Sequence, residues 1–170
     1  METQVIVDLP LLKEHLALDG FHRDVSGIFL NGFYVSSQTI EGGFHTRRVL
    51  EHVGQLIGEN YFKKSTAGNK DELLNEIESF FKKAGLGQLQ FKKLKVPEDK
   101  NVSPEYTAVL KSGVFASFPN IGQNYCFLEK ELIRSAFVAF TGRLNFLVKE
   151  NKCFGLGDDT CEFEITMLPI

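Results

Sequence analysis

Apolar and polar residues alternate along the C-terminal part of the chain with the period of two that half-buried strands have. In the last run the apolar positions are Cys161, Phe163, Ile165 and Met167, and every residue between them is polar. An earlier run alternates in the same way at Leu144, Phe146 and Val148. Two alternating runs joined by a stretch rich in glycine and aspartate predict a β-hairpin at the end of the chain.

Three stretches further upstream have the periodicity of amphipathic helices. The first covers about residues 46–63, and its apolar side is formed by Val49, Val53, Leu56, Ile57 and Tyr61. Gly54 and Gly58 lie four residues apart in this stretch, and each costs roughly 1 kcal/mol relative to alanine in a helix interior. Such a pair indicates that something lies close to the helix, either a crossing helix or a ligand.

The second helix, over residues 69–84, has the clearest boundary signals. Asn69 and Glu72 form a capping box, and Gly85 ends the helix. Its buried stripe is predicted at Leu73, Leu74, Ile77, Phe80, Phe81 and Ala84. The third helix covers residues 126–140, ends at Gly142 and has apolar residues at Leu128, Leu132, Ile133, Ala136, Phe137 and Phe140.

Two strands are predicted between the second and third helices, over residues 88–96 and 106–110, with residues 114–118 as a continuation. The pattern of the first strand slips at Lys92 and Lys93, which a β-bulge would explain. The order helix–helix–strand–strand–helix–strand–strand predicts a single α+β domain with helices packed on an antiparallel sheet. We assign residues 41–170 to this domain and residues 1–40 to an N-terminal extension.

Composition narrows the class of protein. The chain has 170 residues, and its hydrophobic content of 43% is that of an ordinary globular protein with its own core. The net charge of −3 gives no electrostatic footprint for nucleic acid. We find neither a signal peptide nor the run of about 18 apolar residues that a membrane-spanning helix needs. Three cysteines, an odd number, argue against a disulfide framework and predict a cytoplasmic protein.

Two features point to surfaces that bind other molecules. The 16 phenylalanines, with no tryptophan, supply a large apolar area for either a thick core or a hydrophobic ligand cavity. The aromatic segment Ile28–Val35 is too apolar for an exposed edge. We therefore expect it to act as a dimer arm in a two-fold homodimer.

The cysteines point to a metal site. Cys126 begins the third helix, and Cys153 and Cys161 flank the turn of the hairpin. Three thiolates suit zinc, which takes four ligands in structural sites. Glu150 is the nearest candidate for the fourth ligand, but residues i and i+3 of a regular strand face opposite sides, so Glu150 reaches the site only if a bulge lies near Asn151. The other candidates are Asp158, Asp159, His15, His22, His45 and His52. The alternative is that the cysteines are simply buried core residues.

We find no catalytic motif. Gly155 and Gly157 lie in the hairpin turn rather than at the start of a helix, so they indicate no nicotinamide site. No serine, histidine and aspartate arrangement stands out, and a cysteine nucleophile would need a neighbouring base. His45 and His52 fall on roughly one face of the first helix, where a haem or metal role competes with an ordinary surface or core position. We therefore assign no catalytic residues.

The C-terminal motif resembles a known family. The segment Glu150-Asn-Lys-Cys153-Phe-Gly-Leu-Gly-Asp-Asp-Thr-Cys161, with Cys126 ahead of a helix, resembles the closing part of the vinyl-4-reductase domain family, also called predicted hydrocarbon-binding proteins. The resemblance covers roughly residues 43–168 and takes in Gly54 and Gly58. Similar phenol-sensing domains of certain bacterial transcription activators hold a structural zinc on this cysteine–glutamate–cysteine–cysteine set.

The resemblance implies a fold shared with vesicle-tethering TRAPP subunits and similar to haem nitric-oxide-sensing domains. It also implies a homodimer and a structural zinc whose ligands are Cys126, Glu150, Cys153 and Cys161. Residues 41–170 would then be a ligand-binding domain of the vinyl-4-reductase type, in a carrier or accessory protein for a tetrapyrrole, an aromatic or another hydrocarbon. The alternatives are an enzyme or accessory subunit that reduces a chlorophyllide vinyl group in chlorophyll biosynthesis, and a sensor that acts through a separate output protein.

Phenylalanines are the main source of apolar surface for such a pocket, because ligand pockets are largely apolar with few polar groups. We expect the pocket walls to be formed by Gly54, Gly58, Phe80, Phe81, Phe137 and Phe140.

Overall fold

The computed structural model describes residues 44–94, 104–112, 120 and 122–169, and only the backbone of residues 44–46. The predicted dimer arm Ile28–Val35 and the predicted strand continuation 114–118 lie outside the described residues. The elements of the described part are α3 (Phe44–Phe62), α4 (Lys70–Lys83), β1 (Gln88–Lys93), β2 (Pro104–Lys111), α5 (Phe127–Thr141), β3 (Phe146–Lys152), the short 3-10 helix η1 (Phe154–Leu156) and β4 (Cys161–Met167). The predicted order of helices and strands is confirmed. None of the described helices is long and apolar enough to cross a membrane.

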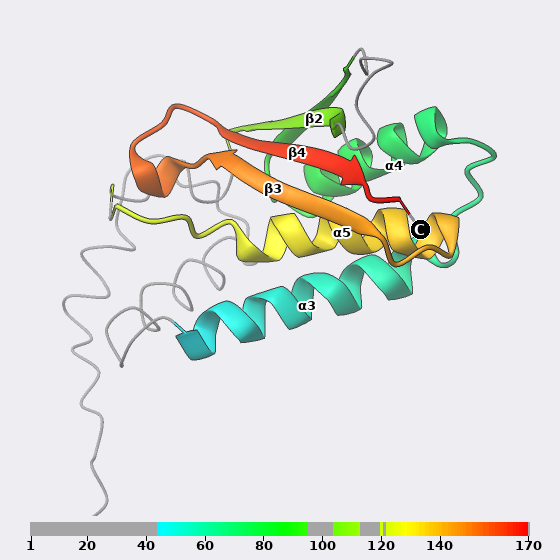
Figure 1. The fold of residues 1–170 in the computed structure, drawn as a ribbon, viewed down its shortest axis with the longest axis horizontal. Helices are drawn as coiled ribbons and strands as arrows, with labels where there is room; N and C mark the ends of the chain where they lie inside the picture. Colours follow the sequence, from blue (N-terminus) through cyan, green and yellow to red (C-terminus); the bar gives the residue numbers. More distant parts are fainter. Residues whose placement is uncertain (1–43, 95–103, 113–119, 121, 170) are drawn as a thin grey trace, which may run out of the picture.

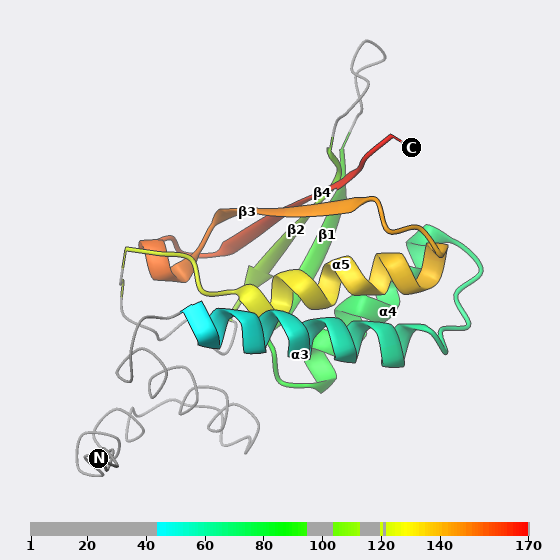
Figure 2. The ribbon, with the colours of Figure 1, turned by 60° about the horizontal axis from the view of Figure 1, so that its bottom comes forward.

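The described strands form one antiparallel sheet in the order β1-β2-β4-β3. The hairpin of β3 and β4 joins the sheet because β4 pairs with β2 (Figure 1). Figure 2 shows the sheet, α5 and α3 as successive layers, with α5 between the sheet and α3. α4 packs against β1. The α+β architecture with helices on an antiparallel sheet is therefore confirmed.

Alternation along the strands sets the core face of the sheet, as the sequence predicts. Tyr106, Ala108 and Leu110 of β2 are buried, and so are Cys161, Phe163 and Ile165 of β4. The opposite face carries polar residues such as Thr107 and Glu164, which pair across β2 and β4. Helix α5 covers the apolar face with Leu132, Ile133, Ala136 and Phe137, all buried.

The two glycines of α3 bring this helix close to α5. A Cβ atom on Gly54 would lie 2.3 Å from the carbonyl oxygen of Leu128, and one on Gly58 would lie 2.6 Å from the Cβ of Ser135. Any side chain here would collide with α5, so the two backbones approach closely only because both residues are glycine. The alternative that the glycines seat a helix crossing therefore accounts for both of them.

The predicted apolar side of α3 is wrong in part. Val49, Leu56 and Tyr61 are 47%, 44% and 44% exposed, while Val53 and Ile57 are half-buried. The side that faces α5 carries the two glycines between buried Leu50 and Phe62. Because glycine contributes almost no hydrophobicity, the pattern pointed to the neighbouring side of the helix.

The ends of α4 follow their local sequence signals. The side chain of Asn69 accepts a hydrogen bond from the backbone N–H of Glu72 at 2.9 Å. The carboxylate of Glu72 in turn accepts from the backbone N–H of Gly68 at 2.7 Å. At the other end Gly85 has φ +71°, and Leu86 N–H donates to the carbonyl of Phe81, which is a Schellman ending. The predicted start and stop are confirmed.

The bulge predicted in β1 is absent. Residues from Gln88 to Lys93 pair with β2 in unbroken register, and Leu94 N–H continues the pairing to the carbonyl of Glu105. β1 ends at Lys93, before the predicted end at residue 96, and residues 95 and 96 lie outside the described residues. Lys92 and Lys93 are both exposed at the end of the strand, which accounts for the apparent slip. An exposed strand end needs no alternation, so the pattern carried no information about register.

Candidate metal centre

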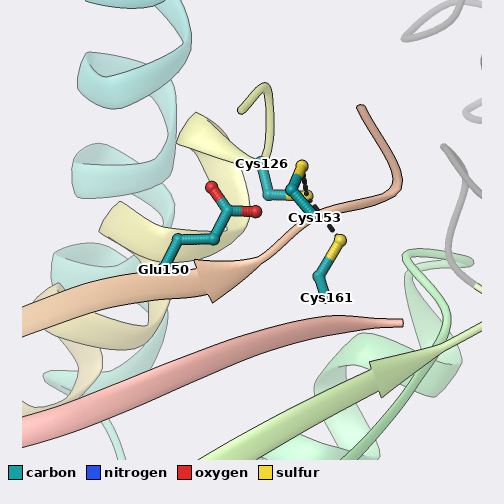
Figure 3. A group of neighbouring side chains, drawn as sticks. All are labelled: Cys126, Glu150, Cys153 and Cys161. Carbon is teal, nitrogen blue, oxygen red and sulfur yellow. Dashed lines mark hydrogen bonds between the residues drawn. The ribbon is translucent and has the colours of Figure 1, made fainter. Parts of the chain in front are cut away.

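The side chain of Cys126 takes no part in capping the helix that follows it. It is the N-cap residue of α5, yet its thiol makes no capping hydrogen bond. Serine, threonine, asparagine and aspartate are the usual residues at such a position because they cap the helix. The thiol of Cys126 is fully buried and directed toward the loop that follows β3 (Figure 3).

A close contact holds that loop beside the start of α5. A Cβ atom on Gly155 would lie 2.2 Å from the carbonyl oxygen of Gln123 and 2.3 Å from the ring of Tyr125. The carbonyl of Gly155 also accepts a hydrogen bond from Gly122 N–H at 2.9 Å. Only glycine at position 155 lets the loop lie this close to the segment before α5. The close contact holds Cys153 near Cys126.

The bulge near Asn151, on which the assignment of Glu150 depended, is present. Glu150 pairs with Phe163, but Lys152 pairs with Glu162, so the register of β3 shifts by one residue between them. The extra residue in β3 allows both Glu150 and Cys153 to reach the core side of the hairpin. The bulge that Glu150 needs in order to face the thiols is therefore present.

Four side chains meet at this point. The ligand atoms of Cys126, Glu150, Cys153 and Cys161 all lie within 4.8 Å of one another. They come from the start of α5, the end of β3, the loop after it and the start of β4, and Figure 3 shows them directed toward a common point. The three cysteines are buried free thiols, and Phe154 N–H donates to the Sγ of Cys161 at 3.5 Å.

The distance between sulfur atoms matches that of two zinc-bound thiolates for one pair of cysteines and is shorter for another pair. Sulfur atoms on a zinc tetrahedron lie about 3.8 Å apart, given a Zn–S distance of about 2.3 Å. The Sγ atoms of Cys126 and Cys153 are 3.8 Å apart. Those of Cys126 and Cys161 are closer, at 3.0 Å, so this pair would have to separate to bind a zinc ion.

The pKa shifts of the group are those of acidic side chains that are buried close together. Hydrogen bonds from the thiols of Cys126 and Cys161 lower the pKa of Cys153. Burial raises the pKa of Cys126 well above its usual range. Burial, and next the charge of Cys153, raises the pKa of Glu150 to about 9. These acidic groups repel one another when ionised, and a bound divalent cation would reverse that effect and favour the ionised forms.

The other candidates for the fourth ligand do not join this group. Asp158 accepts a hydrogen bond from the backbone N–H of Cys153 at 2.9 Å, so it supports the loop instead. Asp159 and His52 are exposed and lie outside the group, while His15 and His22 lie outside the described residues, and no side chain is described for His45.

Sequence reasoning missed one buried acidic residue near the site, Glu129 of α5. Its side chain is fully buried, and burial raises its pKa to about 8. The signal was available, because Glu129 lies four residues before Ile133 and eight before Phe137 and thus on the apolar stripe of α5. An acidic residue on such a stripe is rarely left unpaired.

Two of the four phenylalanines expected around a ligand, Phe80 and Phe137, lie in different aromatic groups. Phe80 contacts Tyr61 and Phe62 edge-on, with ring centroids 4.6 and 5.7 Å away. Phe137 packs against Phe91, Tyr106 and Phe146, with centroids 6.4, 6.0 and 5.3 Å away. Phe81 is fully buried and Phe140 is half-buried. The role of these residues and of Gly54 and Gly58 in ligand binding remains a prediction.

Sequence comparison finds one distant relative. No protein-family model matches the chain. An uncharacterized protein of Methanocaldococcus jannaschii, MJ0150, is 29% identical over 125 residues, which cover 73% of this chain. The match spans 66% of that relative, slightly less than two thirds of its length.

Three solved structures share the fold. The phenol-responsive sensory domain of the transcription activator PoxR, solved with phenol, has a TM-score of 0.66 at 13% identity and covers 84% of this chain and 74% of its own. A vinyl-4-reductase family protein from Methanocaldococcus jannaschii has a TM-score of 0.52 at 17% identity and covers 97% of both chains. Trafficking protein particle complex subunit 3 from Naegleria fowleri, covalently bound to palmitic acid, has a TM-score of 0.56 at 15% identity and covers 85% of this chain and 95% of its own. The fold inferred from the C-terminal motif is therefore confirmed.

Proposed function

We propose that this domain binds a hydrophobic small molecule and that a structural zinc ion stabilises its binding-competent fold. The observation that carries the proposal is the fold, which is shared with a sensory domain solved with phenol and with a subunit bound to palmitic acid. Both ligands are largely apolar. An apolar pocket with few polar groups is the usual site for such molecules.

The proposed zinc is held by Cys126, Glu150, Cys153 and Cys161. Their donor set, three thiolates and one carboxylate, suits zinc better than the oxygen-seeking ions magnesium or calcium. With four protein ligands the ion would cross-link α5, β3 and β4, and its binding free energy would add to the stability of the fold. Elemental analysis of freshly purified protein tests this, with one zinc per chain expected. Protein that contains no zinc and has three freely titrating thiols would contradict it.

The absence of tryptophan offers a direct test of ligand binding. The chain has none, so the variant Phe80→Trp or Phe140→Trp introduces a single fluorescent reporter on the predicted wall. We expect phenol, palmitate or a porphyrin to change the emission of these reporters. The matched control is Phe127→Trp, since Phe127 packs beneath Arg47 and Lys130 rather than in either aromatic group. If no such compound binds the wild-type protein, the binding proposal is wrong.

A sensor function is the second candidate, and its support is the similarity to the phenol-responsive domain of PoxR. A sensor responds to its ligand by a change that another protein detects, whereas a carrier only releases the ligand. Hydrogen exchange with and without phenol would separate the two. Protection confined to the pocket favours a carrier, and protection that extends to the exposed side of α3 favours a sensor.

We also propose a homodimer, in which the segment Ile28–Val35 acts as the arm. An exposed aromatic segment of this kind is unfavourable in water. Light scattering of the full chain should report a dimer at micromolar concentration, and deletion of residues 1–40 should reduce it to a monomer. A monomeric full chain would refute the proposal.

A further inference from the structure

The loop after β3 closes a tight turn on Cys153, one of the proposed zinc ligands. The N–H groups of Leu156 and Asp158 both donate to the Cys153 carbonyl, at 2.9 and 3.2 Å. Gly157 adopts φ +91°, in the left-handed region that favours glycine, and its N–H donates to the carbonyl of Phe154 at 2.9 Å. This turn reverses the chain and returns Asp158 to Cys153.

The backbone N–H of Cys153 takes its partner from this loop and not from the sheet. Pairing between β3 and β4 ends one residue earlier, where Lys152 pairs with Glu162, and Cys153 is fully buried. A buried N–H group without a partner destabilises a fold. The carboxylate of Asp158 accepts this hydrogen bond at 2.9 Å. Asp158 therefore holds both backbone groups of Cys153, the N–H with its side chain and the carbonyl with its own N–H.

A fixed backbone at Cys153 limits where its thiol can lie. Its Sγ is 3.8 Å from that of Cys126, which matches the spacing of two zinc-bound thiolates. The same loop contacts the third cysteine, because Phe154 N–H donates to the Sγ of Cys161 at 3.5 Å. Residues that orient metal ligands without touching the metal contribute to its affinity. Asp158 is placed as such a residue, since the four clustered ligand atoms belong to other side chains.

We propose that Asp158 is a positioning residue of the metal centre, whose carboxylate holds the backbone of Cys153 so that its thiol stays at the distance from Cys126 that zinc requires. This inference rests on the proposed zinc site. The effect passes through a hydrogen bond to the backbone and not through the charge of Asp158. A neutral side chain that offers an acceptor oxygen at the same place should therefore serve as well.

Zinc affinity of the full chain, measured by competition with a chromophoric chelator, tests the inference together with the absorption spectrum of the cobalt-substituted protein. Asp158→Ala removes the acceptor, and we expect zinc affinity to fall by about 10-fold with an altered cobalt spectrum. Asp158→Asn keeps an acceptor in its amide oxygen, so its affinity should stay within about threefold of wild type. If Asp158→Ala does not fold, Asp158→Glu replaces it, because the longer side chain displaces the carboxylate and keeps the charge.

A neighbouring residue supplies the matched control. Asp159 is exposed, whereas Asp158 is half-buried, so Asp159→Ala removes the same charge from the same loop without touching the hydrogen bond to Cys153. It should leave zinc affinity and the cobalt spectrum unchanged. The melting temperature of the metal-free protein completes the comparison. A residue that only supports the fold would lower this temperature and leave the cobalt spectrum of the folded variant as in wild type.

The outcomes distinguish this inference from the proposed function. If wild type binds zinc and Asp158→Ala binds it equally well with the same cobalt spectrum, Asp158 has no positioning role and the zinc site stands. If Asp158→Ala, Asp158→Asn and Asp159→Ala weaken zinc binding equally, only the charge of the loop matters and the inference is wrong. If wild type binds no zinc, the metal centre and this inference fail together.

Discussion

The two ends of α5 are built from different chemistry. At its C-terminal end Phe137 packs among Phe91, Tyr106 and Phe146, all of them from the sheet. At its N-terminal end the same helix buries Cys126 and Glu129 next to further thiols and a carboxyl group. One helix thus joins a purely aromatic contact to a buried cluster of acidic groups.

The difference lies in what each end requires. Apolar side chains are stabilised by removal from water and need no specific partner. The N-terminal end buries polar groups, which are stable only when something pairs with them. Both carboxylate oxygens of Glu129 and the Oε1 of Glu150 have no hydrogen-bond partner among the described residues. The stability of the C-terminal end therefore comes from the packing of apolar side chains. The stability of the N-terminal end would depend on a bound partner such as the proposed zinc ion. Changes at the two ends should have different signatures.

The largest effect should come from the N-terminal end. Cys153→Ser would remove one ligand of the proposed zinc ion, and a strong chelator would remove the ion itself. Either change would take away the metal-binding free energy that adds to the stability of the fold. We expect the melting temperature to fall by about 10 °C or more, since 1 kcal/mol corresponds to about 2–4 °C in a chain of this size. Thermal denaturation with and without chelator measures this. If the chelator leaves the melting temperature unchanged, the N-terminal end of α5 does not depend on a metal, and the proposed difference between the two ends is wrong.

Phe137→Ala should destabilise the C-terminal end by about 3–5 kcal/mol, because it leaves a cavity in a fully packed aromatic group. Urea denaturation at fixed zinc concentration measures this loss. The zinc content of the folded variant should be unchanged, and the chelator should lower its stability by the same further amount as in wild type. Zinc lost together with the aromatic ring would show that the two ends are one cooperative unit.

A substitution at the crossing of α3 and α5 should cost less stability than Phe137→Ala. Gly54→Ala forces a Cβ atom against the carbonyl oxygen of Leu128, and overpacking of this kind costs about 1–3 kcal/mol. Gly68→Ala is the matched control, because its added Cβ would meet only the Glu72 carboxylate at 3.5 Å. If instead Gly54→Ala lost ligand binding at unchanged stability, the glycines would belong to the pocket wall.

How far the sequence predicts this molecule depends on how local each signal is. The ends of α4 follow from Asn69 and Gly85, which act on their own backbone neighbours. The alternation of β4 likewise needs only its own residues. The side of α3 that is buried depends on α5, far away in the chain, and Gly54 and Gly58 leave no hydrophobic signal of it.

The site divides in the same way. Glu150, Cys153 and Cys161 could be grouped from the sequence because they belong to one hairpin. The choice of Glu150 over the other candidates for the fourth ligand came from the resemblance to a known family, and Glu150 reaches the thiols because β3 contains a bulge. Glu129 escaped attention because its helix is buried on the side where an acidic residue is unexpected, and its neighbours come from β3 and the loop after it. Packing between distant segments, rather than any local pattern, decides which polar groups meet.

The smallest effect, and the most specific, is the sign of the pH dependence. In metal-free protein burial raises the pKa of Glu129 to about 8 and of Glu150 to about 9, from an ordinary value of 4.5. Such groups stabilise the fold below their unfolded pKa and lose that contribution as pH rises. The lowered pKa of Cys153 acts oppositely, since its contribution is lost as pH falls.

At pH 6 to 7 the folded metal-free protein therefore holds protons on both carboxyl groups that the unfolded chain lacks, and the proton on Glu129 is about half lost by pH 8. The thiol of Cys153 acts oppositely, because it is ionised in the folded protein and protonated in the unfolded chain. Stability should fall by about 1 kcal/mol per pH unit. In the zinc-loaded protein the three thiols and Glu150 are ionised, while the unfolded chain still binds protons on its thiols, so stability should rise with pH. Denaturation of both forms at pH 6, 7 and 8 measures the two slopes, with Phe137→Ala as a control that should shift both curves without changing either slope. If stability changes with pH in the same direction in both forms, zinc does not ionise the acidic groups at this end of α5, and the prediction is wrong.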